Sequence, residues 1–273
     1  MFKKKSAFGG LLTRLMSAVV LLPPVLAAIW YGDIWFLGLL LFGGILMMLE
    51  WLKLTNVDGM MFKVIALVAM VFVLLNIAEK SEWYFHSFFL SLTLGLVILS
   101  YVYSLFKMRE MAWTSLGLFY VLSPLLALLW IRNQLPPDMD GRIVVFWIFL
   151  LVWGTDIGGY FVGKTFGGPK LAPQISPNKT WSGLVGGMLL AGLLSQLVWG
   201  VFDLSRLELF VASAGLAVFS QMGDLLESAL KRRFKVKDSG GIIPGHGGVL
   251  DRVDGLGPVA VIIAIAISWM LAN

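Results

Sequence analysis

Nine long apolar stretches dominate the sequence and leave few folds open to it. They cover roughly residues 11–30, 34–52, 62–78, 84–106, 112–131, 143–163, 183–202, 207–229 and 256–271. About 20 apolar residues are enough for a helix to cross a bilayer. Only 14% of the residues are charged, against about 25% in soluble domains. The sequence therefore predicts an all-α, polytopic integral membrane protein with about nine transmembrane helices, built as one membrane-embedded domain over residues 1–273.

The basic residues indicate how these helices are oriented, because cytoplasmic loops are enriched in Lys and Arg. With the N-terminus in the cytoplasm, the opposite side keeps only four of the 21 basic residues, namely Lys80, Arg132, Arg142 and Arg206. The basic N-terminus also resembles a signal peptide. Pro23, Pro24 and the lack of a clear cleavage site favour a first transmembrane helix instead. We expect a multi-pass protein of the cell (inner or plasma) membrane with a cytoplasmic N-terminus.

The composition limits the chemistry that this chain can perform. It contains no cysteine and only two histidines. A cysteine nucleophile and a thiolate metal site are therefore excluded, and zinc is not favoured. An oxygen-ligated metal, Mg²⁺ as one or two cations, is the expected cofactor. We expect no nucleic-acid partner. Small and polar residues in several spans are also compatible with a homodimer.

Polar residues divide the chain into two functional halves. Residues 1–140 have short loops and few polar groups, so we expect them to be mainly scaffold helices. Residues 141–273 contain two polar segments, 153–183 and 223–255, which the predicted topology places together on the cytoplasmic side. This second half is the predicted catalytic half.

The first candidate group lies at the end of the eighth apolar stretch. On a continuing helix, Asp224 is followed by Ser228, Lys231 and Arg232 on one face. A carboxylate, a hydroxyl and two cations in line suit a metal ion and the phosphates that it bridges. For the basic run that ends at Lys237, the alternative is a cytoplasmic anchor without a catalytic role.

A glycine-rich turn and two further acids follow. Closely spaced glycines let backbone N–H groups approach an anion. The candidate phosphate-binding residues of the turn are Gly245, His246, Gly247 and Gly248. Asp251 and Asp254 are three residues apart, so on a helix both point to one side. The alternative is an ordinary helix N-terminus with Asp251 as its cap.

The segment 153–183 contributes an acid and a polar loop. Asp156 interrupts an apolar stretch, and an acid within a membrane span is a functional candidate by default. Gly159 and Gly163, four residues apart, favour close helix packing. Three polar residues can bind phosphate oxygens at the start of the next helix, namely Ser176, Lys179 and Thr180. The alternative for Ser176 and Thr180 is a helix cap.

These blocks, in this order, resemble the phosphatidate cytidylyltransferase (CDP-diacylglycerol synthase) family. The family's C-terminal signature here reads Ser228-Ala-Leu-Lys231-Arg232, Lys237-Asp238, Pro244-Gly245-His246-Gly247-Gly248 and Asp251-Arg252-Val253-Asp254. The segments Asp156–Lys164 and Ser176–Gly183 also resemble the family, so the likeness covers the chain from about residue 150 onward. Ser182 departs from the family, which has an acid or amide there, and Asn178 is a looser match.

The resemblance implies a transferase that makes CDP-diacylglycerol and pyrophosphate from CTP and phosphatidic acid. The phosphate of the lipid is itself the nucleophile, so no protein nucleophile is required. The protein's task is to position the substrates and to neutralise charge.

The resemblance also assigns roles to residues. The implied metal ligands are Asp224 and Asp251, followed by Asp254 and Asp156. The implied phosphate-binding cations are Lys231, Arg232, Lys237 and Arg252. The backbone from Gly245 to Gly248 would hold one phosphate. Ser176, Lys179 and Thr180 would bind nucleotide or lipid phosphate.

Two other classes of protein share some of these features. A different lipid-phosphate transferase or a polyprenol kinase also needs acids near the membrane and Mg²⁺, but the pattern of the CDP-alcohol phosphotransferases is absent. A transporter can carry protons or cations on acids such as Asp156 and Asp224, yet the sequence shows no inverted repeat.

Overall fold

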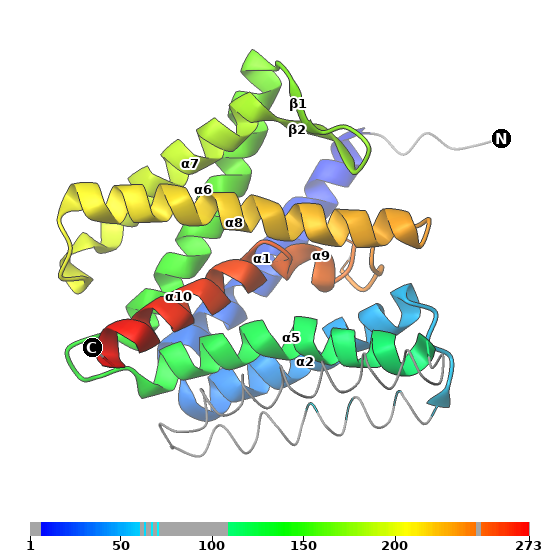
Figure 1. Ribbon diagram of the computed structural model, residues 1–273, viewed down its shortest axis with the longest axis horizontal. Helices are drawn as coiled ribbons and strands as arrows, with labels where there is room; N and C mark the ends of the chain where they lie inside the picture. Colours follow the sequence, from blue (N-terminus) through cyan, green and yellow to red (C-terminus); the bar gives the residue numbers. More distant parts are fainter. Residues whose placement is uncertain are drawn as a thin grey trace.

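The computed structural model describes residues 7–60, the single positions 63, 67 and 70, and residues 109–243 and 247–272 (Figure 1). The helices are α1 (Ala7–Tyr31), α2 (Asp33–Leu54), α5 (Arg109–Gln134), α6 (Gly141–Phe166), α7 (Trp181–Ser195), α8 (Arg206–Arg233), α9 (Leu250–Val253) and α10 (Leu256–Ala272). Helix α7 continues as a 3₁₀ helix, Gln196–Val201. Two short strands, β1 (Lys170–Ala172) and β2 (Ser176–Thr180), complete the described elements.

Five helical segments in this part of the chain are long and apolar enough to cross a membrane. They are Asp33–Leu54, Arg109–Gln134, Gly141–Phe166, Trp181–Val201 and Arg206–Arg233. Each coincides with a predicted span. Val19–Tyr31 and Leu256–Leu271 are apolar helices of shorter length. The predicted spans 62–78 and 84–106 lie outside the described residues apart from positions 63, 67 and 70, so the count of nine stays a prediction.

A small β-hairpin corrects the all-α expectation. Strands β1 and β2 pair antiparallel, with Lys170 opposite Thr180 and Ala172 opposite Ser176. Helix α6 ends at Gly167, whose φ of 60° lies in the left-handed region that glycine adopts without strain. Prolines at positions 169, 173 and 177 then prevent a new helix, because proline lacks the N–H that a helix interior requires. The polar segment forms a hairpin instead.

Glycines allow α6 and α7 to pack very closely. A Cβ atom added to Gly158 would collide with the carbonyl of Gly186, and one on Gly187 would lie 2.7 Å from the carbonyl oxygen of Thr155. A Cβ on Gly163 would lie 2.9 Å from Thr180 Oγ1. The predicted close packing is therefore confirmed at Gly163, whereas a Cβ on Gly159 would only come within 3.6 Å of the Gly183 carbonyl oxygen.

The other helices pack around this pair and bring the two halves of the chain together. Helix α8 packs on α7 and α10, while α5 packs on both α2 and α10 (Figure 1). The short α9 contacts α2. Helix α8 begins with a capping box, in which Ser205 and Glu208 satisfy each other's backbone N–H groups. One side of the bundle therefore holds three segments: the last turn of α8, the hairpin and the loop before α9 (Figure 1).

Candidate active site

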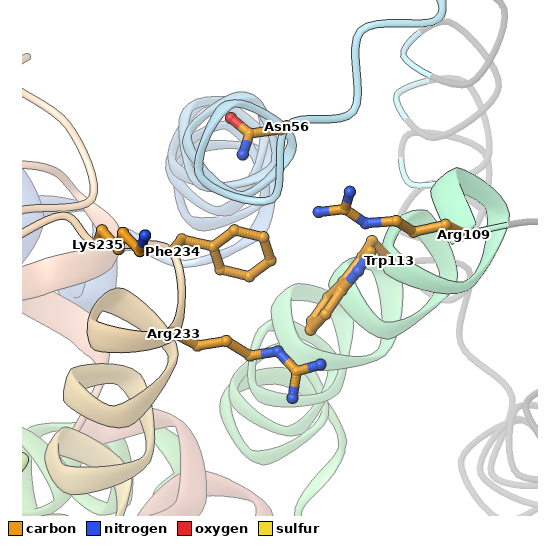
Figure 2. Close-up of a pocket in the computed structure, with 6 residues that line it drawn as sticks. All are labelled: Asn56, Arg109, Trp113, Arg233, Phe234 and Lys235. Carbon is orange, nitrogen blue, oxygen red and sulfur yellow. The ribbon is translucent and has the colours of Figure 1, made fainter.

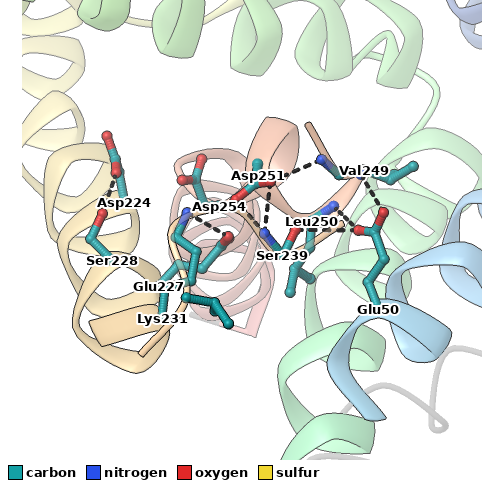
Figure 3. Close-up of polar contacts among 12 residues, drawn as sticks. Glu50, Asp224, Glu227, Ser228, Lys231, Ser239, Val249, Leu250, Asp251 and Asp254 are labelled. Carbon is teal, nitrogen blue, oxygen red and sulfur yellow. Dashed lines mark hydrogen bonds and ion pairs between the residues drawn. The ribbon is translucent and has the colours of Figure 1, made fainter. Parts of the chain in front are cut away.

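The carboxylate of Asp251 organises the loop that precedes α9 (Figure 3). Its Oδ1 accepts a hydrogen bond from Lys231 Nζ at 2.6 Å. Its Oδ2 accepts from the backbone N–H groups of Ser239 at 3.0 Å and Gly248 at 2.9 Å. Burial by itself raises the pKa of Asp251, but the hydrogen bonds from Lys231 and Gly248 outweigh it and lower the pKa to about 2. Asp251 therefore stays ionised and ties the end of α8 to the loop.

Glu50 of α2 holds the same loop from the opposite side. Its carboxylate accepts hydrogen bonds from the N–H groups of Val249 at 3.0 Å and Leu250 at 2.9 Å, and from the Ser239 hydroxyl at 3.4 Å. The side chain is only 4% exposed. A Cβ atom on Gly248 would overlap with this carboxylate. Glu50 therefore fixes the loop and the first N–H groups of α9, although it belongs to the predicted scaffold half.

Glu227 is a second buried acid that the sequence interpretation missed. It is 0% exposed, and its Oε1 lies 3.1 Å from Lys231 Nζ. Lys231 thus lies between two acids, as a buried cation requires. We call these residues the anchored cluster: Glu50, Glu227, Lys231, Ser239 and Asp251. Glu50 and Glu227 both interrupt apolar stretches, the same signal that singled out Asp156, so the sequence contained a clue to both.

Three other acids form a second group, the carboxylate face, which consists of Asp156, Asp224 and Asp254. They come from α6, from α8 and from the turn after α9. Asp156 is exposed, and the other two are half-buried. Burial raises the pKa of Asp254 to about 7, and the negative charges of Asp224 and Asp156 act in the same direction. The three carboxylates are therefore near enough to repel one another.

A lysine from the hairpin joins the two polar segments at this face. Lys179 Nζ on β2 lies 2.5 Å from Asp224 Oδ2 on α8. Ser228 Oγ donates to the other oxygen of Asp224 at 3.3 Å. Arg232 Nε donates to the carbonyl of Ile175 in the hairpin at 3.3 Å. Segments 153–183 and 223–255 therefore contact each other, while their place on the cytoplasmic side stays a prediction.

The remaining predicted hairpin residues mainly support local structure. Thr180 caps α7, because its Oγ1 accepts from the N–H of Gly183 at 3.1 Å. The alternative reading of Thr180 as a cap is thus confirmed, and its contact with substrate stays a prediction. Ser182, the departure from the family pattern, donates to the carbonyl of Gly167 and lies 3.0 Å from Thr180 Oγ1. Ser176 is half-buried in β2.

The glycine-rich turn is described only in part. Gly247 has a φ of 87°, a left-handed conformation that favours glycine, and its carbonyl accepts from the N–H of Ile243 at 3.0 Å. Gly245 and His246 lie outside the described residues. Lys237 and Arg252 are exposed, so both are accessible to a soluble anion.

The carboxylate face fits Mg²⁺ by its donor chemistry, since Mg²⁺ prefers oxygen ligands from one or two carboxylates together with substrate phosphates. Burial and, after it, the negative charges of Asp224 and Asp156 raise the pKa of Asp254, and a bound cation would offset both effects. Within the part of the chain that the structure describes, no three acids or histidines are gathered closely enough to enclose a metal on their own. Substrate phosphates or water would have to supply the other ligands.

Comparison with known proteins identifies the family. A model of the cytidylyltransferase family matches residues 12–270. The chain belongs to the cytidylyltransferase family. A phosphatidate cytidylyltransferase of Brucella suis is 38% identical over 257 residues, which cover 89% of this chain and 88% of that protein. The phosphatidate cytidylyltransferase of Bacillus subtilis is 42% identical over 164 residues, or 58% of this chain and 60% of the relative. One from Rickettsia bellii is 38% identical over 194 residues, 67% and 73% of the two chains.

Membership of the cytidylyltransferase family confirms the resemblance found in the signature. In this member, the signature residues divide between the two acidic groups. Lys231 and Asp251 belong to the anchored cluster, whereas Asp254 belongs to the carboxylate face and Ser228 binds to it. The signature therefore contributes both to the architecture of the loop and, through Asp254 and Ser228, to the carboxylate face.

Proposed function

We propose that this chain transfers CMP from CTP to phosphatidic acid, giving CDP-diacylglycerol and pyrophosphate. The contact between Lys179 and Asp224 carries the proposal, because it brings the two polar segments of the sequence into one site. The relatives named above, which share 38% to 42% identity with the chain, support the choice of substrates.

The reaction needs no nucleophile from the protein. An oxygen of the phosphatidate phosphate attacks the α-phosphorus of CTP, and a new P–O bond forms there. The bond from the α-phosphorus to the bridging oxygen breaks, and that oxygen leaves with its electron pair as part of pyrophosphate. Two anionic substrates must approach each other, so the site has to neutralise charge and hold both groups in line.

Several cations around the carboxylate face can neutralise and position the substrate phosphates. Lys179 and Arg232 lie at the boundary of α8 and the hairpin, where they can contact phosphates. Arg252 and Lys237 are exposed beside the loop and can hold the departing pyrophosphate. Lys231 is buried between two acids, so its direct contact with phosphate requires a rearrangement of the anchored cluster.

Asp156, Asp224 and Asp254 would hold one or two Mg²⁺ ions, which supply positive charge to the triphosphate when bound. Asp251 is also a predicted ligand. Its oxygens accept hydrogen bonds from Lys231, Ser239 and Gly248. It would have to exchange one of these donors to bind a metal, so we rank it below the other three.

The proposed enzyme lies in the cell membrane with its N-terminus and active site on the cytoplasmic side, where CTP is available. The distribution of Lys and Arg along the sequence supports this orientation. The proposed enzyme has about nine spans, including the two that fall largely outside the described residues. It is also proposed to form a homodimer. The diacylglycerol chains would stay in the bilayer while the phosphate enters the site from the headgroup region.

Transfer of label from CTP into lipid tests the function. Purified full-length protein in detergent would receive phosphatidic acid, α-³²P-labelled CTP and Mg²⁺. We expect label in the lipid phase, dependent on both substrates and abolished by EDTA. A folded protein that moves no label into phosphatidic acid would contradict the proposed function. Activity that survives EDTA would contradict only the metal assignment.

A further inference from the structure

A basic pocket lies at the C-terminal end of α8 (Figure 2). It has a volume of about 350 Å³ and opens where α2, α5 and α8 end or begin. The lining residues are Asn56, Arg109, Trp113, Arg233, Phe234 and Lys235. Three of the six are cations and none is an acid, so the pocket is strongly positive.

Aromatic contacts give this pocket a fixed floor. The Arg233 guanidinium lies 5.5 Å from the centre of the Trp113 ring. Trp113 and Phe234 meet edge to face, with their centroids 5.1 Å apart. The backbone carbonyl of Trp113 also accepts a hydrogen bond from Trp51 Nε1 of α2 at 2.8 Å. Arg233 is therefore oriented by the fold, unlike a cation on a freely moving surface chain.

The turn that ends α8 brings in a second cation. Lys235 has a φ of 58°, in the left-handed region that only glycine adopts without strain. The turn is closed by a hydrogen bond from the Lys235 N–H to the Arg232 carbonyl at 3.1 Å. Glycine is the usual residue at this place after a helix. The turn thus places a second cation among the residues that line the pocket.

The pocket is separate from the active site. Arg232 contacts Ile175 of the hairpin, whereas the adjacent Arg233 lies over Trp113 of α5. The two arginines therefore point to different neighbours of the same helix end, Arg232 to the hairpin and Arg233 to α5. None of the lining residues is a member of the anchored cluster, the carboxylate face or the family signature.

We propose that this pocket binds a phosphate group. Arginine presents a planar fork of donors that matches phosphate oxygens, and lysine adds a mobile point charge. The pocket lies at the ends of the second, fifth and eighth apolar stretches, which is the depth of lipid headgroups. An anionic lipid headgroup and a soluble phosphate compound share this chemistry, and the two sources are separated by experiment.

The test measures thermal unfolding of the purified full-length protein in an uncharged detergent. One series adds short-chain phosphatidylglycerol, with short-chain phosphatidylcholine as the additive lacking net charge. A second series adds inorganic phosphate, with sodium chloride at matched ionic strength. The variants are Arg233→Gln and Arg206→Gln. Arg206 is a matched control, because it lies at the opposite end of α8 and also covers a tryptophan, with its guanidinium 4.3 Å from the Trp199 ring centre.

We expect the anion to raise the melting temperature of wild type and Arg206→Gln equally. In Arg233→Gln, the apparent Kd should rise about tenfold, as expected for the loss of one charge-assisted hydrogen bond. Dependence on Arg233 in the first series assigns a lipid headgroup, and dependence only in the second assigns a soluble phosphate. Equal responses of all three proteins in both series would overturn the proposal. Arg233→Lys, which keeps the charge, should retain part of the response.

Discussion

The anchored cluster and the carboxylate face contain acids of the same chemical type, yet the protein treats them in opposite ways. In the anchored cluster, Asp251 and Glu50 each accept hydrogen bonds from several donors and are almost inaccessible to water. On the carboxylate face, Asp224 has Lys179 and Ser228 as partners and remains 30% exposed. The first group holds a loop in place, whereas the second keeps unsatisfied negative charge within reach of a ligand.

This contrast distinguishes acids that build a site from acids that can act in it. A carboxylate whose lone pairs are filled by backbone N–H groups has little capacity left for a metal or a substrate. Burial and the charges of Asp224 and Asp156 raise the pKa of Asp254, so added positive charge beside this group is favourable. Each of the following substitutions therefore affects either stability or turnover more strongly, according to the group that it alters.

The largest expected effect is that of Lys231→Met on stability. It removes the only described side-chain cation beside Glu227 and Asp251, which then lie buried and unpaired. Breaking a buried ion pair by removing one partner costs about 3–5 kcal/mol. Thermal unfolding in detergent measures the loss, with the exposed Lys170→Met as the control. If both variants unfolded like wild type, the anchored cluster would not be a structural unit.

Asp224→Asn should instead lower turnover while the protein stays folded. Losing one preorganised charged group at a phosphoryl-transfer site reduces kcat by about 10²–10³-fold. The melting temperature should change little, because Asp224 is partly exposed. Transfer of label from CTP to lipid measures kcat, and Asp203→Asn, an exposed acid at the other end of α8, is the control. A normal kcat in Asp224→Asn would remove this residue from the site.

Glu50→Gln tests whether the scaffold half supports the loop. The two N–H groups bond to different oxygens of Glu50, so the amide oxygen still accepts from one of them, while the N–H₂ group faces the N–H of either Val249 or Leu250. Leaving a buried donor without its acceptor costs about 1–3 kcal/mol. The melting temperature should fall, whereas the exposed Asp58→Asn should have no effect. A loss of activity without any loss of stability would point to a role for Glu50 beyond the support of the loop.

The smallest effect is expected at the cap of α7. Thr180→Ala removes the acceptor of the Gly183 N–H and should cost about 1 kcal/mol. Thr180→Ser keeps the hydroxyl and should restore the stability. If Thr180→Ala also lost turnover at a temperature where it stays folded, and Thr180→Ser regained it, the hydroxyl would contact substrate as well, as the sequence predicted.

The sequence predicted the parts of this structure that depend on local patterns. Apolar length located the five long spans, and the four-residue spacing of Gly159 and Gly163 indicated close packing of α6. The hairpin escaped notice because its strands are only three and five residues long. They show no clear alternation of apolar and polar positions.

The sequence could not distinguish the two acidic groups. Asp251 and Asp254 stand three residues apart, and nothing local shows that one meets Lys231 while the other lies beside Asp224. That difference depends on contacts between distant segments. The contact of Glu50 with residues 249 and 250 is of the same kind, because it joins positions about 200 residues apart. Glu50 could be recognised in the sequence as an acid within an apolar stretch, but the backbone N–H groups that it binds could not.

The close contact between α6 and α7 has a consequence for the geometry of the site. Asp156 lies on α6, while Thr180 and the hairpin lead directly into α7, so the bare backbones of Gly158 and Gly186 set the separation of the acid from the hairpin. Adding a single methyl group at either glycine would push the two helices apart and widen that separation. The distance between Asp156 and the hairpin is therefore set by two residues that have no side chain, and a change at Gly158 or Gly186 would reach the candidate site without touching any of its polar groups.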